Sequence, residues 1–242
     1  MLSPMQAHIA AVKKQQVKEV TEAAHESGNV DVIKHTAENY SEFEVLTVAA
    51  ECDASNVRKL ASSDRNEARE TFLKKYMRHV KAYLDLGDVY ANPVFVYVVM
   101  MLVDLGRISD VVKFGFIAVA QQQQTPIFIK RDMATFISDS VLAWSEKEYK
   151  LGKSVSPYFN QTFTKLDEWS VPNVVKMKFN KLAGLIAFDE KKFEQTVKYF
   201  EAAIGFEEGS NKAKVGTKLN KAKELISKQK PNTSKSDNTA ED

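Results

Sequence analysis

Cysteine, glycine and proline are all scarce in this chain of 242 residues, which has one Cys, 9 Gly and 6 Pro. A single cysteine, Cys52, excludes an internal disulfide and fits a reducing cytosol, and we expect it to be a small buried apolar side chain. Turn-rich β architectures need more glycine and proline. The composition therefore predicts an all-α protein built from long helices.

Long hydrophobic runs are also missing. The most apolar stretch, 93–103, ends at Asp104 and falls short of the roughly 20 residues that cross a bilayer. The opening segment 1–18 is amphipathic and lacks the apolar run of a secretory signal. We therefore expect no membrane association. A helix that is apolar on nearly every side, as 93–103 would be, is typical of a core helix or a subunit contact.

Motifs for catalysis and metal binding are absent as well. The chain has no G-x-x-x-x-G-K-[ST] phosphate loop, and its four histidines show no H-x-H or H-E-x-x-H spacing. Cys52 and His79 carry no pattern of a nucleophile pair. The tight acidic sets of the second half, Asp167-Glu168 and Asp189-Glu190-Lys191, are ordinary at helix turns. We expect no cofactor, no metal site and no catalytic residue.

Charge is segregated along the chain, although its net value is only +2. Acidic side chains dominate 22–53, basic ones dominate 58–81, and a lysine-rich segment covers 212–230. Such zoning can set one surface against phosphates while another repels them.

Hydrophobic periodicity and turn residues predict the helices. Ser3-Pro4 begins a first helix, Asp53 or Ser55 caps a short one, and Gly87 ends the helix over 64–86. Asn92-Pro93 begins the apolar helix. The run Gln121–Gln124 is interpreted as a polar helix terminus. The other expected helices cover about 31–51, 109–123, 132–150, a shorter one from 157, 172–188, 190–208 and 211–229.

The helix over 64–86 has the clearest two-sided pattern. Its apolar stripe includes Phe72, Tyr76 and Val80. The opposite side carries a basic set, which is either a solvated surface or a phosphate-binding face. Candidate DNA-binding residues are this set, with three lysines of the first helix as second choice: Lys74, Lys75, Arg78 and Lys81, then Lys13, Lys14 and Lys18.

Two segments of the chain resemble each other. Residues 107–119 align without gaps on 192–204, and the later hairpin carries Gly184, Phe200 and Ala203 in a nearly tetratricopeptide-like pattern. Small residues let paired helices approach closely. We expect stacked helical hairpins, partly tetratricopeptide-like. We assign 1–90 to DNA binding, 91–228 to a helical-hairpin core for oligomerisation and 229–242 to a disordered tail.

Several stretches, taken together with their order and spacing along the chain, resemble one known family. The opening Leu2-Ser3-Pro4-Met5-Gln6-Ala7-His8 is similar to an S-P-x-Q-x-H start. Further similar stretches are Tyr83–Gly87, Met100–Ile108, Val171–Val175 and Lys181–Leu185, with a closing Lys-rich helix. Together they resemble the small terminase subunits of temperate, contractile-tailed bacteriophages that package from cohesive ends. The tail departs from the family's basic tails, because it mixes lysines with Asp237, Glu241 and Asp242.

The resemblance implies a homo-oligomeric ring in the host cell cytoplasm. This ring would recognise the viral packaging (cos) site on double-stranded DNA and regulate cutting and packaging by the large ATPase and nuclease subunit. Because small terminase subunits often carry a helix-turn-helix, the resemblance also implies one near 42–60. Some members are named endonuclease subunits. Two alternatives stay open: a helical-repeat adaptor for other proteins, and a subunit with its own metal-dependent nuclease activity.

Overall fold

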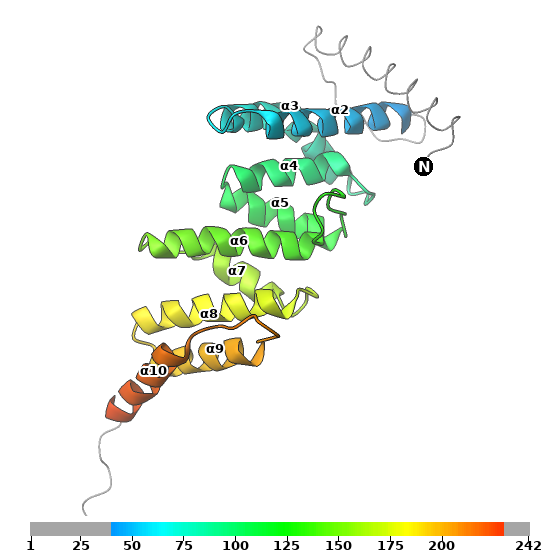
Figure 1. Ribbon diagram of the computed structural model, residues 1–242. Coiled ribbons are helices and arrows are strands. Elements are labelled where there is room, and N and C mark those ends of the chain that lie inside the picture. Colours follow the sequence, from blue (N-terminus) through cyan, green and yellow to red (C-terminus); the bar gives the residue numbers. More distant parts are fainter. Residues whose placement is uncertain (1–39, 230–242) are drawn as a thin grey trace, which may run out of the picture. The chain divides into compact units, whose positions relative to one another are not determined.

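The computed structural model describes residues 40–229 and divides the chain into two compact units, one ending at Ile137 and the other beginning at Ser138. The first unit contains helices α2 (Tyr40–Lys59), α3 (Arg65–Leu86), α4 (Pro93–Asp104) and α5 (Ile108–Ala120). The second contains α7 (Tyr158–Lys165), α8 (Asn173–Asp189), α9 (Phe193–Gly205) and α10 (Gly216–Gln229). Helix α6 (Met133–Lys150) begins in the first unit and continues in the second (Figure 1).

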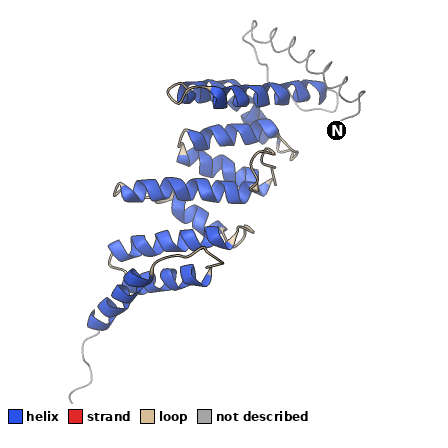
Figure 2. Cartoon of the chain, viewed as in Figure 1, coloured by secondary structure: helices blue, strands red, loops and turns tan. Residues whose placement is uncertain are grey.

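The predicted fold class is confirmed, because the regular elements of residues 40–229 are helices (Figure 2). The helices expected before residue 40 and the expected disordered tail, 229–242, lie almost wholly outside the described residues. The division into 1–90, 91–228 and 229–242 concerns roles rather than packing, and it stays a prediction.

Helix α4 is the centre of the first unit and packs against α2, α3 and α5. Its N-cap is Asn92, whose side-chain oxygen accepts a hydrogen bond from the Phe95 backbone N–H at 3.0 Å. Every residue from Val94 to Val99 is buried, as expected for a helix without a polar face. Of the two sequence interpretations, core helix or subunit contact, the structure supports the core helix.

Helix α2 differs from the prediction, which had a second short helix beginning at Asp53 or Ser55. It runs without a break from Tyr40 to Lys59, so the described residues contain no helix-turn-helix at 42–60. The reason is visible at Asp53, whose carboxylate accepts hydrogen bonds from Lys75 and Tyr76 of α3. That carboxylate is therefore not a helix cap.

Cys52 is exposed, and the prediction that it is buried is wrong. The buried stripe of α2 includes Phe43, Leu46, Ala50, Ala54 and Val57. This spacing of three and four residues leaves position 52 on the outer side of the helix.

The glutamine run 121–124 ends α5, as predicted, and also fastens the loop between α3 and α4. Gln123 is 3% exposed. Its side-chain amide donates to the Tyr90 carbonyl at 2.7 Å and to the Tyr83 hydroxyl at 3.1 Å, and its side-chain oxygen accepts from the Asn92 N–H at 2.8 Å. Burial raises the pKa of the Tyr83 phenol. A network with these donors and acceptors satisfied fixes the loop geometry.

Four helices, α4, α5, α6 and α8, end in the same turn. After α4, the Gly106 N–H donates to the Val103 carbonyl at 2.9 Å and the Arg107 N–H to the Leu102 carbonyl at 3.0 Å. The same two bonds recur after the other three helices. This is the Schellman arrangement, which needs a left-handed residue just beyond the helix. The left-handed residues are Gly106, Gln122, Gly152 and Lys191.

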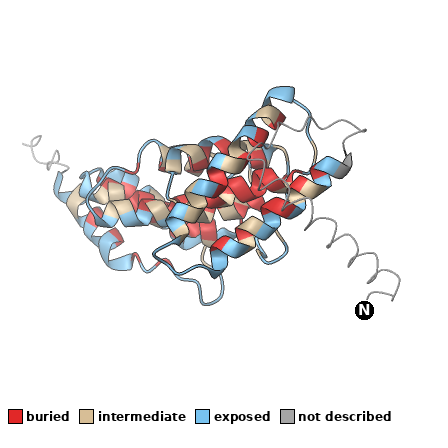
Figure 3. Ribbon diagram, turned by 90° about the horizontal axis from the view of Figure 1, so that it is seen from above, coloured by how far each residue is buried: buried red, intermediate tan, exposed pale blue. Residues whose placement is uncertain are grey.

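The second unit is built around the α8–α9 hairpin and stacked aromatic rings. The rings of Phe159 and Phe179 stack at 5.1 Å between centroids, and α10 adds Leu219 to a cluster around Phe200. Figure 3 shows buried residues (red) where helices meet and exposed residues (pale blue) on their outer sides.

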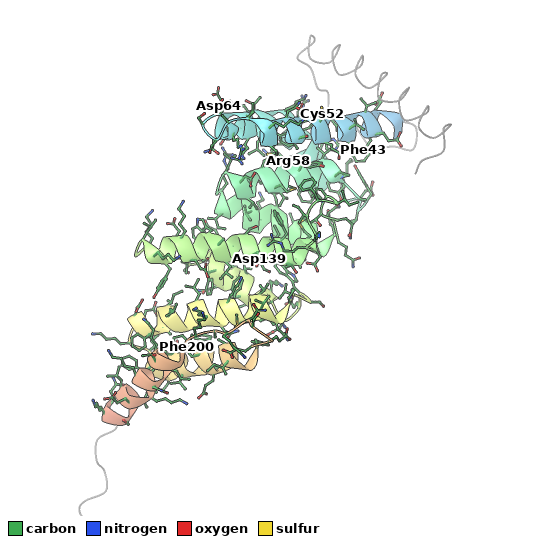
Figure 4. The ribbon with its side chains drawn as sticks, viewed as in Figure 1. Phe43, Cys52, Arg58, Asp64, Asp139 and Phe200 are labelled. Atoms are coloured by element: carbon green, nitrogen blue, oxygen red, sulfur yellow. The ribbon has the colours of Figure 1, made fainter. Side chains whose placement is uncertain are left out.

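The close helix pairing expected from Gly184 is confirmed. A Cβ atom at Gly184 would lie 2.5 Å from the ring of Phe200, and Phe200 is 0% exposed (labelled in Figure 4). The aligned segments 107–119 and 192–204 also agree in structure, since α5 and α9 begin one residue into each.

We expect Gly184→Ala to lower the free energy of unfolding by about 1–3 kcal/mol, because the added methyl group forces the buried ring of Phe200 to move. Gly205→Ala is the matched control, since a Cβ atom there would meet no atom within 4 Å. Urea unfolding of both variants provides the measurement. Equal stability of the two variants would contradict the proposed packing constraint.

Candidate nucleic-acid interface

The exposed side of α3 carries three cations in one stripe: Lys74, Arg78 and Lys81 are exposed. Their spacing of four and three residues places them on one helix face at about 100° per residue. The opposite face is buried and includes Phe72, Tyr76, His79, Val80 and Tyr83. Among the described residues, no ion pair engages the three cations, so their charges are available to a ligand.

Lys75, the fourth candidate, occupies a different environment. Its ammonium lies 3.0 Å from Asp53 Oδ2, and the Tyr76 hydroxyl donates to the same oxygen at 2.8 Å. Burial, and then the Asp53 carboxylate, raise the pKa of the Tyr76 phenol well above its usual range. Lys75 thus neutralises a half-buried carboxylate and joins α3 to α2.

Two ion pairs position the N-terminal half of α3 on the α4–α5 turn. Arg69 lies 3.0 Å from Asp104, and Arg107 donates to both oxygens of Glu70 at 2.7 Å. Arg69 belongs to the basic zone of the sequence, but its charge is used inside the protein. The zone therefore presents fewer free cations than its composition suggests.

Acidic residues lie at both ends of the cationic stripe. Glu67 precedes Lys74 by seven residues and Asp85 follows Lys81 by four, and both are exposed. By helical spacing they share the face of the three cations. The positive surface is consequently short, and one protomer can offer only a few phosphate contacts.

The other candidate residues lie elsewhere. Lys13, Lys14 and Lys18 lie outside the described residues. In the lysine-rich segment, Lys223 pairs with Glu201 and Lys228 with Glu224. Cys52 is exposed and His79 is buried against Phe43.

The acidic sets of the second half take part in local contacts. Asp167 pairs with Lys176, Glu168 with Lys165 and Glu190 with Lys192. Asp189 accepts a hydrogen bond from the Tyr149 hydroxyl at 2.6 Å. Burial, and then this hydrogen bond, raise the pKa of Tyr149 to about 12. Within residues 40–229, no three His, Cys, Asp or Glu side chains gather as metal ligands. In the same range, no helix combines the length and apolar character needed to traverse a bilayer.

The chain is similar to a known protein family. The family model described as phage small terminase subunit matches residues 47–174, more than half of the chain. The chain belongs to this family. The matched range includes α3 with its cationic stripe and all of α4 and α5. The resemblance inferred from the sequence is thereby confirmed at the level of the family.

A relative from Haemophilus phage HP1 is named a probable terminase, endonuclease subunit. It is 29% identical over 178 residues, which cover 72% of this chain and 63% of the relative. The matched region thus spans less than two thirds of the relative's length. No solved structure matches the chain.

We expect Lys75→Met to lower the free energy of unfolding by about 1 kcal/mol, because it leaves the half-buried Asp53 carboxylate without its cation. Lys74→Met is the matched control. It removes the same charge from an exposed position and should change stability by less than about 0.5 kcal/mol. Thermal or urea unfolding measures both. If the two variants lose the same stability, the ion pair to Asp53 has no structural role.

Proposed function

We propose that this protein is a terminase small subunit that binds the packaging (cos) site of viral double-stranded DNA as a homo-oligomeric ring in the host cytoplasm. The ring presents this DNA to the large terminase subunit and regulates its cutting and packaging. The observation that carries the proposal is the exposed stripe Lys74, Arg78 and Lys81, within the region that matches the family.

The short stripe explains why assembly would matter. Three phosphate contacts give weak, salt-sensitive binding. Several protomers that engage one duplex turn later contacts into intramolecular ones and can raise affinity by a factor of about 10²–10⁴. Lys75 lies beside the stripe, but we propose that it contributes little to DNA binding because Asp53 holds its ammonium. Lys13, Lys14 and Lys18 remain second candidates.

These cations would position the DNA without reading its sequence, because lysine and arginine contacts to phosphate are independent of the bases. Recognition of a particular site would then need base contacts from other residues, or a site that bends easily around the ring.

Participation in cutting is a second candidate function, favoured by the name of the HP1 relative, an endonuclease subunit. We propose that the chain contributes by placing DNA before the nuclease of the large subunit. Incubation of the purified protein with duplex DNA and Mg²⁺ tests this division of labour. Nicking by the small subunit alone, abolished by substitution of an acidic residue, would assign the nuclease to this chain.

Charge reversal tests the DNA-binding face. The triple variant Lys74→Glu, Arg78→Glu and Lys81→Glu should bind duplex DNA at least roughly tenfold more weakly at low salt, with a flatter salt dependence. The control triple Lys147→Glu, Lys178→Glu and Lys198→Glu changes three other exposed lysines and alters net charge equally. Gel-shift titrations compare the two. Equal losses would indicate a non-specific effect of net charge, and unchanged binding would exclude this face.

The mass of the native particle separates the proposal from a helical-repeat adaptor. We expect the purified protein to form a closed assembly of several chains, as measured by light scattering or native mass spectrometry. A monomer without DNA affinity at low salt would support the adaptor and exclude the ring.

A further inference from the structure

The loop between α5 and α6 presents an apolar tip. The Ile129 N–H donates to the Pro126 carbonyl at 2.8 Å, which closes a turn with Ile127 and Phe128 at its centre. The Thr125 hydroxyl also donates to the Arg131 carbonyl at 2.6 Å. These bonds hold the loop in shape. Ile127 is 100% exposed and Phe128 is 49% exposed, an unusual position for adjacent large apolar side chains.

Positive charge flanks this loop tip, defined as Ile127 and Phe128. The Arg58 guanidinium lies over the Phe128 ring, 4.4 Å from its centroid. Lys130 and Arg131 follow one residue later, after Ile129, and both are exposed. The nearby Asp132 caps α6, since its carboxylate accepts from the Thr135 N–H at 2.7 Å. The loop tip is therefore an apolar knob with cations around it.

The same unit contains a cleft between α2 and α3, with a volume of about 430 Å³. Unlike the protruding, positively charged loop tip, this cleft is concave and has acidic residues in its lining. Its apolar lining includes Val57, Leu60, Ala68 and Phe72. Leu60 is 38% exposed, so part of this lining faces solvent.

Acidic residues line the cleft beside these apolar groups. They are Asp53, Asp64 and Glu67. Asp53 is neutralised by Lys75, whereas Asp64 and Glu67 are exposed at the start of α3 (Asp64 is labelled in Figure 4).

We propose that the loop tip of one copy inserts into the α2–α3 cleft of a second copy. The apolar side chains of Ile127 and Phe128 would cover Leu60 and Ala68, the solvent-facing part of the apolar lining, and Lys130 would approach Glu67. One contact then accounts for both features: exposed apolar groups are buried, and the exposed charges of Lys130 and Glu67, which are opposite in sign, are paired. A positively charged surface would repel the cations beside the loop tip. The acidic residues of the cleft attract them instead.

The contact joins two different surfaces, so each copy can offer its loop to one neighbour and its cleft to another. Heterologous contacts of this kind generate rings when the rotation closes. The inference rests on the proposed homo-oligomeric function and specifies its interface.

Single substitutions test each side of the contact. Ile127→Ser should weaken assembly by roughly tenfold or more, because it removes the apolar anchor, while its full exposure leaves the fold unaffected. Leu151→Ser is the matched control, since Leu151 is 59% exposed and lies outside the contact. Lys130→Glu and Glu67→Lys should each weaken assembly, and the double variant should restore it by exchanging the charges.

A mixing experiment distinguishes this interface from other modes of assembly. Ile127→Ser retains an intact cleft, and Glu67→Lys retains an intact loop tip. Their mixture should form a heterodimer and stop there, as read by native mass spectrometry. Larger mixed assemblies would overturn the head-to-tail contact.

Failure of the interface and failure of the proposed function give different results. If the wild type assembles and Ile127→Ser assembles equally well, the contact is overturned and the ring stands. If the wild type remains a monomer, both are overturned. If Ile127→Ser loses DNA affinity with an unchanged particle mass, the tip contacts DNA rather than a second copy, and the proposal is again overturned.

Discussion

Helix α4 has scarcely a polar side chain, and water must therefore be excluded from all its sides. This requirement determines the packing of the first unit. Helices α2, α3 and α5 pack around α4 and turn their own apolar stripes towards the core. Since α3 turns Phe72, Tyr76 and Val80 towards the interior, helical geometry sends Lys74, Arg78 and Lys81 outward. The cationic stripe is thus a consequence of how the core is covered.

Charged residues between the helices refine this arrangement. The pairs Arg69–Asp104 and Glu70–Arg107 fix α3 against the α4–α5 turn, and Lys75 with Asp53 fixes it against α2. Exposed pairs contribute little energy individually, but these three join α3 at defined positions to α2 and to the α4–α5 turn. The cationic surface that remains unpaired is then small and well defined, which fits the proposal that several copies share one DNA ligand.

The sequence predicts the helices well because capping and periodicity are local. Gly87 and Asn92 mark their boundaries correctly, and Gly184 correctly indicates a close helix pair. The same local reasoning gave wrong predictions for Asp53, which does not cap a helix, and for Cys52, which is exposed. Whether Asp53 caps a helix or accepts from Lys75 depends on a helix more than twenty positions later, and local pattern contains no such information. The exposure of the loop tip was not predicted for a related reason. The sequence after Thr125-Pro126 does not indicate whether tertiary packing covers an apolar residue there.

The repeated turn after α4, α5, α6 and α8 has a further consequence for how such a chain can diversify. Its shape depends on backbone hydrogen bonds and one left-handed residue, so it dictates little about the neighbouring side chains. In the turn after α4, the neighbouring side chains Asp104 and Arg107 form ion pairs. In the turn after α5, the neighbouring side chain is the buried amide of Gln123. At each of these four helix ends, the side chains can therefore change while the backbone turn, and with it the direction of the chain, is preserved.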